Sequence, residues 1–412
     1  MDIGPLRRHR DFRLLFTGQA LSFFGSEVTY VAIPYQTFQL THSTLMVGLI
    51  SLAEFVPLLV MPFVGGALSD AFDRRRLIQF AELASALGVG VLLVNALLPE
   101  PRLWVLFVVV PFLAALYGIF RPSLDALVPR LVTRDELAAA SALEGFRGTL
   151  GSIAGPALAG VIIAVAGLPV AYALDLITFV ASLGTLWLMR SVPPPEDAAR
   201  PSLAGVFEGV RYAWSRKELL GSYGVDIVAM FFGMPMALFP AVAEGFGGGA
   251  AVLGLLYAFP QVGALFATAT SGWVARVHRH GLAIVLASLG WGVSIVVFGL
   301  AENLALALVA LGAAGASDMV SGIFRMTMWN QTIPDRLRGR LAGIEQVSYT
   351  SGPLLGNLRA GVIGELAGVR ASIVSGGVLC VIGVVLVASA LPLFRRYDAR
   401  ASQSDSPPVG AL

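Results

Sequence analysis

Twelve apolar segments follow one another along almost the whole chain, separated by short polar loops. A helix that crosses a bilayer needs ~20 mostly apolar residues, and each segment has at least that length. The segments lie near residues 13–37, 44–68, 75–98, 103–127, 138–165, 170–190, 219–242, 250–274, 281–301, 304–330, 341–366 and 370–393. We therefore expect an all-α membrane protein with twelve transmembrane helices.

The composition excludes the soluble classes of protein. Hydrophobic residues make up 56% of the 412 residues and charged residues only 13%, with a mean hydropathy of +0.78. Soluble domains carry about 25% charged residues. The net charge of +2 is spread over short loops, which is not the pattern of a nucleic-acid-binding surface. The only cysteine, Cys380, rules out an internal disulfide and a metal site built on paired cysteines.

Arginine clusters predict the orientation of the chain, because such clusters mark the cytoplasmic side of a membrane protein. They precede the first segment, occupy alternate loops and follow the last segment: Arg7, Arg8, Arg10, Arg74, Arg75, Arg76, Arg130, Arg134, Arg276, Arg279, Arg336, Arg338, Arg340, Arg395, Arg396 and Arg400. The opposite loops hold Arg102, Arg370 and little other positive charge. We expect both termini and the central linker to be cytoplasmic. The basic N-terminus lacks a cleavage site and is interpreted as leading into an uncleaved first helix.

The two halves of the chain repeat one another. Four residues of the first half recur 206 positions later: Gly18, Pro34, Gly48 and Gly66 match Gly224, Pro240, Gly254 and Gly272. Two charged residues also recur, since Arg121 and Glu144 match Arg325 and Glu345. We expect a six-helix bundle over residues 1–192, a cytoplasmic linker over 193–217, a second six-helix bundle over 218–396 and a disordered cytoplasmic tail over 397–412. Transporters built from such repeats bind their substrate near the middle of the membrane, between the halves.

The loop between the second and third segments carries the most specific motif, GGALSDAFDRRRL at residues 65–77. It resembles the loop signature of the major facilitator superfamily, Gly-x-Leu-x-Asp-Arg-x-Gly-Arg-Arg. The matching residues are Gly66, Leu68, Asp70, Arg74 and Arg75. Ala71 and Asp73 replace an Arg and a Gly of that signature. The resemblance implies the twelve-helix major facilitator fold and a gating role for this loop.

The fifth segment contains a second motif, GSIAGPALAG at residues 151–160. Glycines four residues apart let another helix approach closely, and Pro156 removes a backbone donor and bends the helix. The motif resembles the antiporter motif of the superfamily, Gly-x-x-x-Gly-Pro-x-x-Gly-Gly, which is associated with exporters. The matching residues are Gly151, Gly155, Pro156 and Gly160, while Ala159 replaces one glycine. Ordinary packing of small residues is the alternative interpretation.

Ionisable side chains inside apolar segments are costly and are therefore functional candidates. The proton-coupling candidates are Glu27, Asp226 and Asp318, and of these Glu27 and Asp318 lie deepest. Glu54 and Gln261 are candidates for substrate binding. Each carboxylate, including Glu82 and Asp175, has a structural alternative as a member of an ion pair or as a group near the membrane interface.

Arg147 lies ~15 Å into the fifth segment. It either pairs with Glu144, one helical turn away, or faces the cavity and binds an anionic group of the substrate. For the repeat-related Arg121 and Arg325, and for Glu144 and Glu345, we expect roles in gating or in anchoring helices. The histidines considered, His42, His278 and His280, fall in loops or near helix ends and suggest neither a metal site nor a catalytic pair. The chain has no Gly-rich phosphate loop, which argues against direct use of ATP.

Five further stretches narrow the resemblance to the enterobactin-exporter branch of the superfamily. They are residues 11–34, NALLPEP at 95–101, the VPPP that opens the linker, ALFPAVAE at 237–244 and GLLYAFPQVGAL at 254–265. The branch implies a proton-coupled exporter of organic small molecules in the inner membrane, working by alternating access, with a siderophore as the expected substrate. We expect a monomer without a cofactor or enzymatic activity, whose partners are the substrate, protons and the bilayer.

Two other functions remain open at this point. The first is a drug or macrolide exporter of broad specificity, since relatives in the branch have that activity. The second belongs to another class, a membrane sensor without transport or a polytopic membrane enzyme. An enzyme would need clustered polar groups at a membrane face, and a sensor usually carries a sizeable soluble domain. The sequence shows neither feature.

Overall fold

The structure is a computed structural model that describes residues 2–192, 211–212, 214–333 and 335–400. Of residues 335–340, 342–344 and 346 it describes the backbone only. Most of the predicted linker over 193–217, and the predicted tail beyond Arg400, lie outside the described residues.

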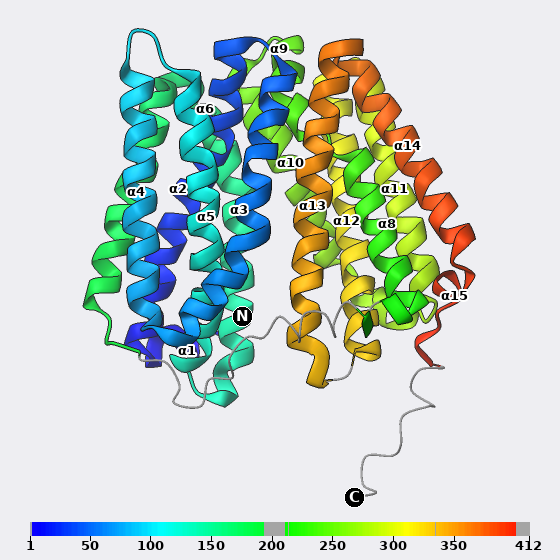
Figure 1. Ribbon diagram of the computed structural model, residues 1–412, viewed down its shortest axis with the longest axis horizontal. Coiled ribbons are helices and arrows are strands. Elements are labelled where there is room, and N and C mark those ends of the chain that lie inside the picture. Colours follow the sequence, from blue (N-terminus) through cyan, green and yellow to red (C-terminus); the bar gives the residue numbers. More distant parts are fainter. Residues whose placement is uncertain (1, 193–210, 213, 334, 401–412) are drawn as a thin grey trace, which may run out of the picture. The chain divides into compact units, whose positions relative to one another are not determined.

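Every regular element in the described part of the chain is a helix (Figure 1). The α-helices are α1 (Gly4–Arg8), α2 (Arg10–Thr41), α3 (Thr44–Ala71), α4 (Arg74–Leu97), α5 (Leu103–Leu127), α6 (Leu137–Leu188), α8 (Lys217–Gly233), α9 (Phe239–Gly245), α10 (Gly249–Ala269), α11 (His280–Leu300), α12 (Leu304–Thr332), α13 (Asp335–Ala367), α14 (Val369–Ala390) and α15 (Pro392–Arg395). Short 3-10 helices are η1 (Val128–Arg130), η2 (Arg134–Glu136), η3 (Met236–Leu238) and η4 (Ser271–Arg276).

Nine helical stretches among the described residues are long and apolar enough to cross a membrane. One of them contains α6, which turns at Gly167 and so covers the fifth and sixth predicted segments. Gly167 has φ 83°, a conformation that glycine adopts without a steric penalty. Outside these nine, α2 and α13 cover the first and eleventh predicted segments. The prediction of an all-α membrane protein is confirmed.

The seventh predicted segment is not the single helix that the sequence analysis expected over 219–242. The chain leaves the helical conformation at Met234 (φ −84°, ψ 115°), and η3 and α9 follow. Pro235 is the cause, because proline has no backbone N–H to donate and disfavours the helical conformation in the residue before it. The eighth predicted segment also ends early, since α10 stops at Ala269 and η4 follows.

Side-chain caps set the start of three of the long helices. The side chain of Ser43 accepts a hydrogen bond from Met46 N at 3.3 Å, and that of Asn303 accepts one from Leu306 N at 2.9 Å. Asp73 Oδ1 accepts one from Arg76 N at 3.2 Å. Each cap satisfies a backbone donor that the first helical turn leaves unpaired. Short polar loops therefore suffice to separate α2 from α3, α3 from α4 and α11 from α12.

The chain divides into two compact units. Unit 1 comprises Met1–Pro201 and Ala237–Ala258, and unit 2 comprises Ser202–Met236 and Phe259–Leu412. Unit 1 thus holds α1 to α6 together with α9 and the first part of α10. Unit 2 holds α8, the rest of α10 and α11 to α15. The units therefore do not coincide with the two halves of the sequence repeat.

Unit 1 has a core in which α2 packs against α6 and α3 packs against α5. A buried apolar cluster joins α2, α4, α5 and the end of α6, and consists of Leu15, Ile78, Leu124, Leu127, Leu186 and Met189. Gly65 brings α3 so close to α5 that a Cβ atom there would collide with the backbone of Gly118 and Ile119. Phe38 and Val47 pack with Ala237 in a second cluster, beside α9. In Figure 1, α9 lies at the end of unit 1 opposite to α1.

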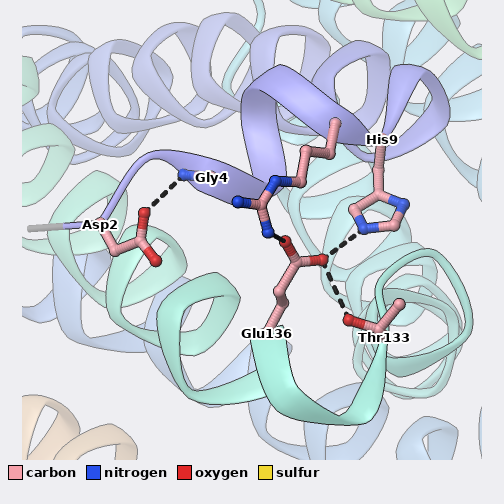
Figure 2. A network of polar contacts seen from close by, with 6 residues as sticks. Asp2, Gly4, His9, Thr133 and Glu136 are labelled. Atoms are coloured by element: carbon pink, nitrogen blue, oxygen red, sulfur yellow. Dashed lines mark hydrogen bonds and ion pairs between the residues drawn. The ribbon is translucent and has the colours of Figure 1, made fainter.

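The short helix α1, which the sequence analysis did not predict, is tied to the chain around η2 by Glu136 (Figure 2). The Glu136 carboxylate accepts a hydrogen bond from Arg8 Nη1 at 2.9 Å and one from Thr133 Oγ1 at 3.0 Å, and His9 Nε2 lies 2.5 Å from its second oxygen. Nearby, Phe12 packs on Ala140 and Leu143 of α6. The N-terminal segment is therefore held against the start of α6.

Unit 2 is built around α8 and α11. α8 packs against α13 and α14, and α11 packs against α12 and α14. Glycine permits backbone contact between α10 and α12, because a Cβ on Gly263 would meet the carbonyl group of Gly312 and one on Gly315 would meet that of Pro260. α15 turns back onto α11, where the Phe394 carbonyl lies against Gly281. The membrane helices of this unit therefore pack partly through their backbones.

Candidate functional site

Two carboxylates and three aromatic rings gather in unit 1. Glu27 and Tyr30 lie one helical turn apart on α2, Glu54 lies on α3, and Phe239 and Tyr257 come from α9 and α10. Tyr30 interacts electrostatically with both Glu27 and Glu54, and Tyr257 interacts with Glu54. The Tyr30 and Tyr257 rings are edge-on at 5.4 Å, and those of Tyr257 and Phe239 are edge-on at 5.1 Å. We call these five residues the acidic–aromatic cluster.

The carboxylates of this cluster have few hydrogen-bond or ion-pair partners among the described residues. Glu27 Oε1 accepts a hydrogen bond from Ser152 Oγ at the long distance of 3.4 Å. Neither Glu27 nor Glu54 has an ion pair with any residue that the structure describes. Carboxylate oxygens of this kind can accept hydrogen bonds from hydroxyl or amine groups, and the flanking rings can stack on an aromatic ligand. The cluster is suited to a ligand that donates hydrogen bonds and is unfavourable for an anion.

Two other buried carboxylates of unit 1 accept hydrogen bonds from neutral donors. Glu82 Oε1 accepts hydrogen bonds from Gln19 Nε2 at 2.6 Å and from Ser182 Oγ at 2.9 Å, which joins α2, α4 and α6. Asp175 accepts one from Thr29 Oγ1 at 2.5 Å, which ties α6 to α2. These contacts favour a structural role for Glu82 and Asp175 over a functional one. The partners are neutral hydrogen-bond donors and not the cations of an ion pair.

A second charged group lies in unit 2 and centres on Arg325 of α12. Its guanidinium forms an ion pair with Asp226 of α8, and these two side chains are only 3% and 4% exposed. Arg325 Nη2 lies 3.8 Å from Asp318 Oδ1, whose side chain is 45% exposed. Ser348 Oγ donates a hydrogen bond to Asp226 Oδ2 at 3.1 Å, and the Arg325 guanidinium lies over the ring of Tyr349 at 5.2 Å. Asp226 and Asp318, which were expected to be separate proton sites, both lie beside one arginine.

The loop at 65–77 is a tight hairpin in which Arg74 holds α3, α4 and α5 together. Its Nε donates to the carbonyl of Ser69 at 3.3 Å and its Nη1 to that of Ala126 at 3.0 Å. Arg75 Nη2 donates to the carbonyl of Trp187 at 3.1 Å. Asp70 lies close enough to Arg74 to interact with it electrostatically. Asp73, which departs from the family signature, is the N-cap of α4.

Gly66 has an open position in this hairpin, because a Cβ atom there would meet no other group within 4 Å. Its match to the family signature therefore has no packing explanation in this structure. The space next to it is free for a side chain or for another part of the chain.

The glycines of the second motif pack against α2 and α10, and one of them lies directly against Glu27. A Cβ atom on Gly151 would collide with the Phe23 ring, and one on Gly155 would collide with the side chain of Glu27. A Cβ on Gly160 would meet the Ala250 carbonyl and would lie 2.9 Å from Gly254 Cα. Pro156, whose carbonyl lies against Gly254, completes this contact. The motif therefore packs α6 on α2 beside Glu27 and on the first part of α10.

Comparisons with known proteins agree with this architecture. The family model described as a transmembrane secretion effector matches residues 2–411. The enterobactin exporter EntS of Shigella boydii serotype 4 (strain Sb227) is 31% identical over 98% of each chain, as is EntS of Escherichia coli (strain SE11). The chain belongs to the transmembrane secretion effector family of the major facilitator superfamily.

Solved transporters share the fold at low sequence identity. A bacterial homologue of the iron transporter ferroportin in an inward-facing state has a TM-score of 0.69 at 15% identity, covering 94% of this chain and 98% of that one. The nucleoside transporter NupG has a TM-score of 0.68 at 14% identity, covering 94% and 100%. The protein is therefore a multi-pass transporter of the inner membrane with the major facilitator fold, and a small molecule is its substrate.

In this transporter, Arg147 pairs with Glu144. Its Nη2 lies 2.6 Å from Glu144 Oε2, its side chain is 10% exposed, and its guanidinium lies over the Phe23 ring at 5.7 Å. The contacts of Arg147 therefore agree with the first interpretation, an ion pair with Glu144 one helical turn away. A guanidinium committed in this way is a weak candidate for binding an anionic substrate.

The repeat-related anchors occupy comparable places in the two units. Arg121 interacts electrostatically with Glu144 in unit 1, and Arg325 does so with Glu345 in unit 2. They differ in their ion-pair partners, because Arg121 pairs with the exposed Asp125 at 3.1 Å and Arg325 with the buried Asp226. The positions of the first half that correspond to Asp226 and Asp318 are Ala20 and Ala114. The buried charge network is therefore a feature of the second half alone.

Arg359 is a charged residue that the sequence analysis missed. It lies on α13 within the eleventh predicted segment, and its guanidinium contacts Gly376 of α14. Its Nε and Nη1 are buried and make no hydrogen bond with any described residue. The signal was present, because an arginine inside an apolar segment is costly wherever it occurs. Gln261, the last of the predicted substrate-binding residues, lies half-buried on α10.

The contact between Gly160 and Gly254 gives a first prediction. Gly160→Ala is expected to lower the stability of the transporter by about 1–3 kcal/mol, because the added methyl group must separate two backbones. Gly148→Ala on the same helix is the matched control. A Cβ there meets no group within 4 Å, so this change is expected to be neutral or slightly stabilising. Thermal unfolding in detergent compares the two, and equal midpoints would contradict the close approach.

Proposed function

We propose that this transporter exports an iron-free siderophore across the inner membrane by alternating access, in exchange for protons. The observation that carries the proposal is the 31% identity to EntS, an enterobactin exporter, over 98% of both chains. A match along the whole length covers all the helices from which a substrate path could be built. Both termini and the linker are proposed to be cytoplasmic, and the transporter is proposed to act as a monomer.

The acidic–aromatic cluster supports a catechol-bearing substrate. An iron-free catechol offers hydroxyl donors to Glu27 and Glu54 and an aromatic ring to Tyr30 and Tyr257. Iron binding removes the hydroxyl protons and makes the molecule anionic, so that repulsion by the two carboxylates would reject the loaded complex. This charge argument favours a donor-bearing siderophore over the anionic substrate considered for Arg147.

Proton coupling is supported by the scarcity of hydrogen-bond and ion-pair partners around the Glu27 carboxylate. Among the described side chains, only Ser152 donates a hydrogen bond to Glu27, at the long distance of 3.4 Å. Protonation of Glu27 would break no ion pair with any described residue. Substrate donors and a proton would then compete for the same oxygens, which links export to proton entry.

Deletion of the gene, followed by complementation, tests the substrate. We expect cells grown without iron to retain the siderophore when the gene is deleted, and to release it again when the wild-type gene is returned. Glu54→Gln should restore release only partly, because it removes an acceptor of the cluster. The measurement is siderophore in the medium and in the cell by mass spectrometry. Normal release from the deletion strain, with retention of a drug or macrolide instead, would favour the broad-specificity exporter.

A further inference from the structure

Unit 2 contains a cavity of about 660 Å³ that none of the residues discussed above explains. It lies between η4, the start of α11, the end of α12 and the segment that follows α15. Its polar lining consists of Ser271, His278, His280, Thr327, Gln331 and Arg400. No carboxylate is among the described residues that line it.

The walls of the cavity are fixed by specific contacts. Ala399 N donates a hydrogen bond to the carbonyl of His278 at 2.9 Å, which fastens the segment after α15 to the start of α11. The His280 ring lies between those of Phe324 and Tyr397, at 5.3 and 6.2 Å. The Tyr397 hydroxyl donates to Gln331 Oε1 at 3.3 Å. The cavity is therefore formed before any ligand arrives.

The charge around this cavity is positive. Arg400 lines it, and Arg279, Arg395 and Arg396 lie in the adjoining segments. His280, only 5% exposed, begins the 21-residue helix α11, whose N-cap makes no side-chain hydrogen bond. The first turn of such a helix carries the positive end of the helix dipole and favours an anion. Asp398 interacts electrostatically with His280, but the four arginines outnumber this one carboxylate, so the surroundings stay positive.

We propose that this cavity binds the phosphate group of an anionic ligand. His278, Arg400 and the hydroxyls of Ser271 and Thr327 would supply the hydrogen-bond donors. Basic pockets between membrane helices on the cytoplasmic side accept lipid head groups, and a soluble phosphate presents the same chemistry. No residue of the acidic–aromatic cluster lines this cavity, so the proposal does not depend on the identity of the exported substrate.

Native mass spectrometry of the full-length transporter in detergent tests the site, with phosphatidylglycerol and phosphatidylcholine as lipid probes. We expect phosphatidylglycerol to be retained in preference to phosphatidylcholine. Removing the Arg400 cation should weaken its binding about fivefold. His278→Ala/Arg400→Ala, which also removes a hydrogen-bond donor, should therefore weaken it more than Arg400→Gln alone. A rise in the unfolding temperature with inorganic phosphate, lost in the double variant, would identify a soluble phosphate as the ligand instead.

Arg276→Ala is the matched control, because Arg276 lies in η4 next to lining residues and is exposed without lining the cavity. It should leave binding of phosphatidylglycerol and of inorganic phosphate within about twofold of the wild type, since solvent and salt screen the exposed Arg276 charge. The proposal is overturned if neither phosphatidylglycerol nor inorganic phosphate binds, or if the double variant binds them as the wild type does. It is also overturned if Arg276→Ala weakens binding as much as the double variant. For a variant that folds poorly, hydrogen exchange over residues 271–280 is a second measurement. Phosphatidylglycerol should slow this exchange in the wild type and leave it unchanged in the double variant.

Discussion

Replacing Arg325 with methionine is expected to destabilise the transporter by about 3–5 kcal/mol, because the change leaves the buried carboxylate of Asp226 without its cation. Among the residues that the structure describes, Asp226 would then keep only the hydrogen bond from Ser348. The expected result is a low yield of folded protein and a lower unfolding midpoint, measured by fluorescence-detected size exclusion after heating.

Removal of the carboxylate in place of the arginine should lower the stability less. Asp226→Asn leaves Arg325 with Asp318 at 3.8 Å and with the electrostatic interaction of Glu345. The double variant Asp226→Leu/Arg325→Met should regain most of the lost stability, since an apolar pair of similar volume often replaces a buried ion pair without loss.

Arg121→Met is the matched control, because it removes the repeat-related arginine, whose ion pair with Asp125 is more than half exposed. It should cost no more than about 1 kcal/mol. Either of two results would contradict the idea that burial makes the loss of Arg325 costly. One is a double variant less stable than Arg325→Met, and the other is an Arg121→Met variant destabilised as strongly as Arg325→Met.

The second large effect is expected at Glu27. Glu27→Gln should retain substrate binding and downhill transport but lose export driven by a pH gradient, because an amide cannot carry the proton. The measurement is substrate flux in proteoliposomes with and without an imposed pH gradient. Asp318→Asn is the parallel test in unit 2, where the half-exposed carboxylate lies beside Arg325.

Glu82→Gln is the control for this experiment. Glu82 is buried and accepts hydrogen bonds from Gln19 and Ser182, so its loss should affect stability and leave the coupling to protons intact. If Glu27→Gln and Asp318→Asn both still export against a gradient, the coupling carboxylate lies elsewhere, and Glu54 would be the next candidate.

The sequence by itself determined the class of protein, most of the membrane helices and the family. Apolar length is a local property, since every ~20-residue apolar run must satisfy its backbone hydrogen bonds within a helix when it lies in lipid. For this reason the predicted segments 44–68 and 103–127 correspond closely to α3 and α5. The hairpin at Asp73 and the break at Pro235 are also local, and the second of these could have been predicted from the proline.

Only the tertiary structure decided which charges meet. Asp226, Asp318 and Arg325 read as three separate costly residues in the sequence, and the packing of α8 on its neighbours is what turns two of them into an ion pair. The same holds for Glu27, whose surroundings depend on the approach of Gly155. The rotation of each helix about its axis sets these contacts, and that rotation results from packing over the whole unit and not from the residues next to the charge.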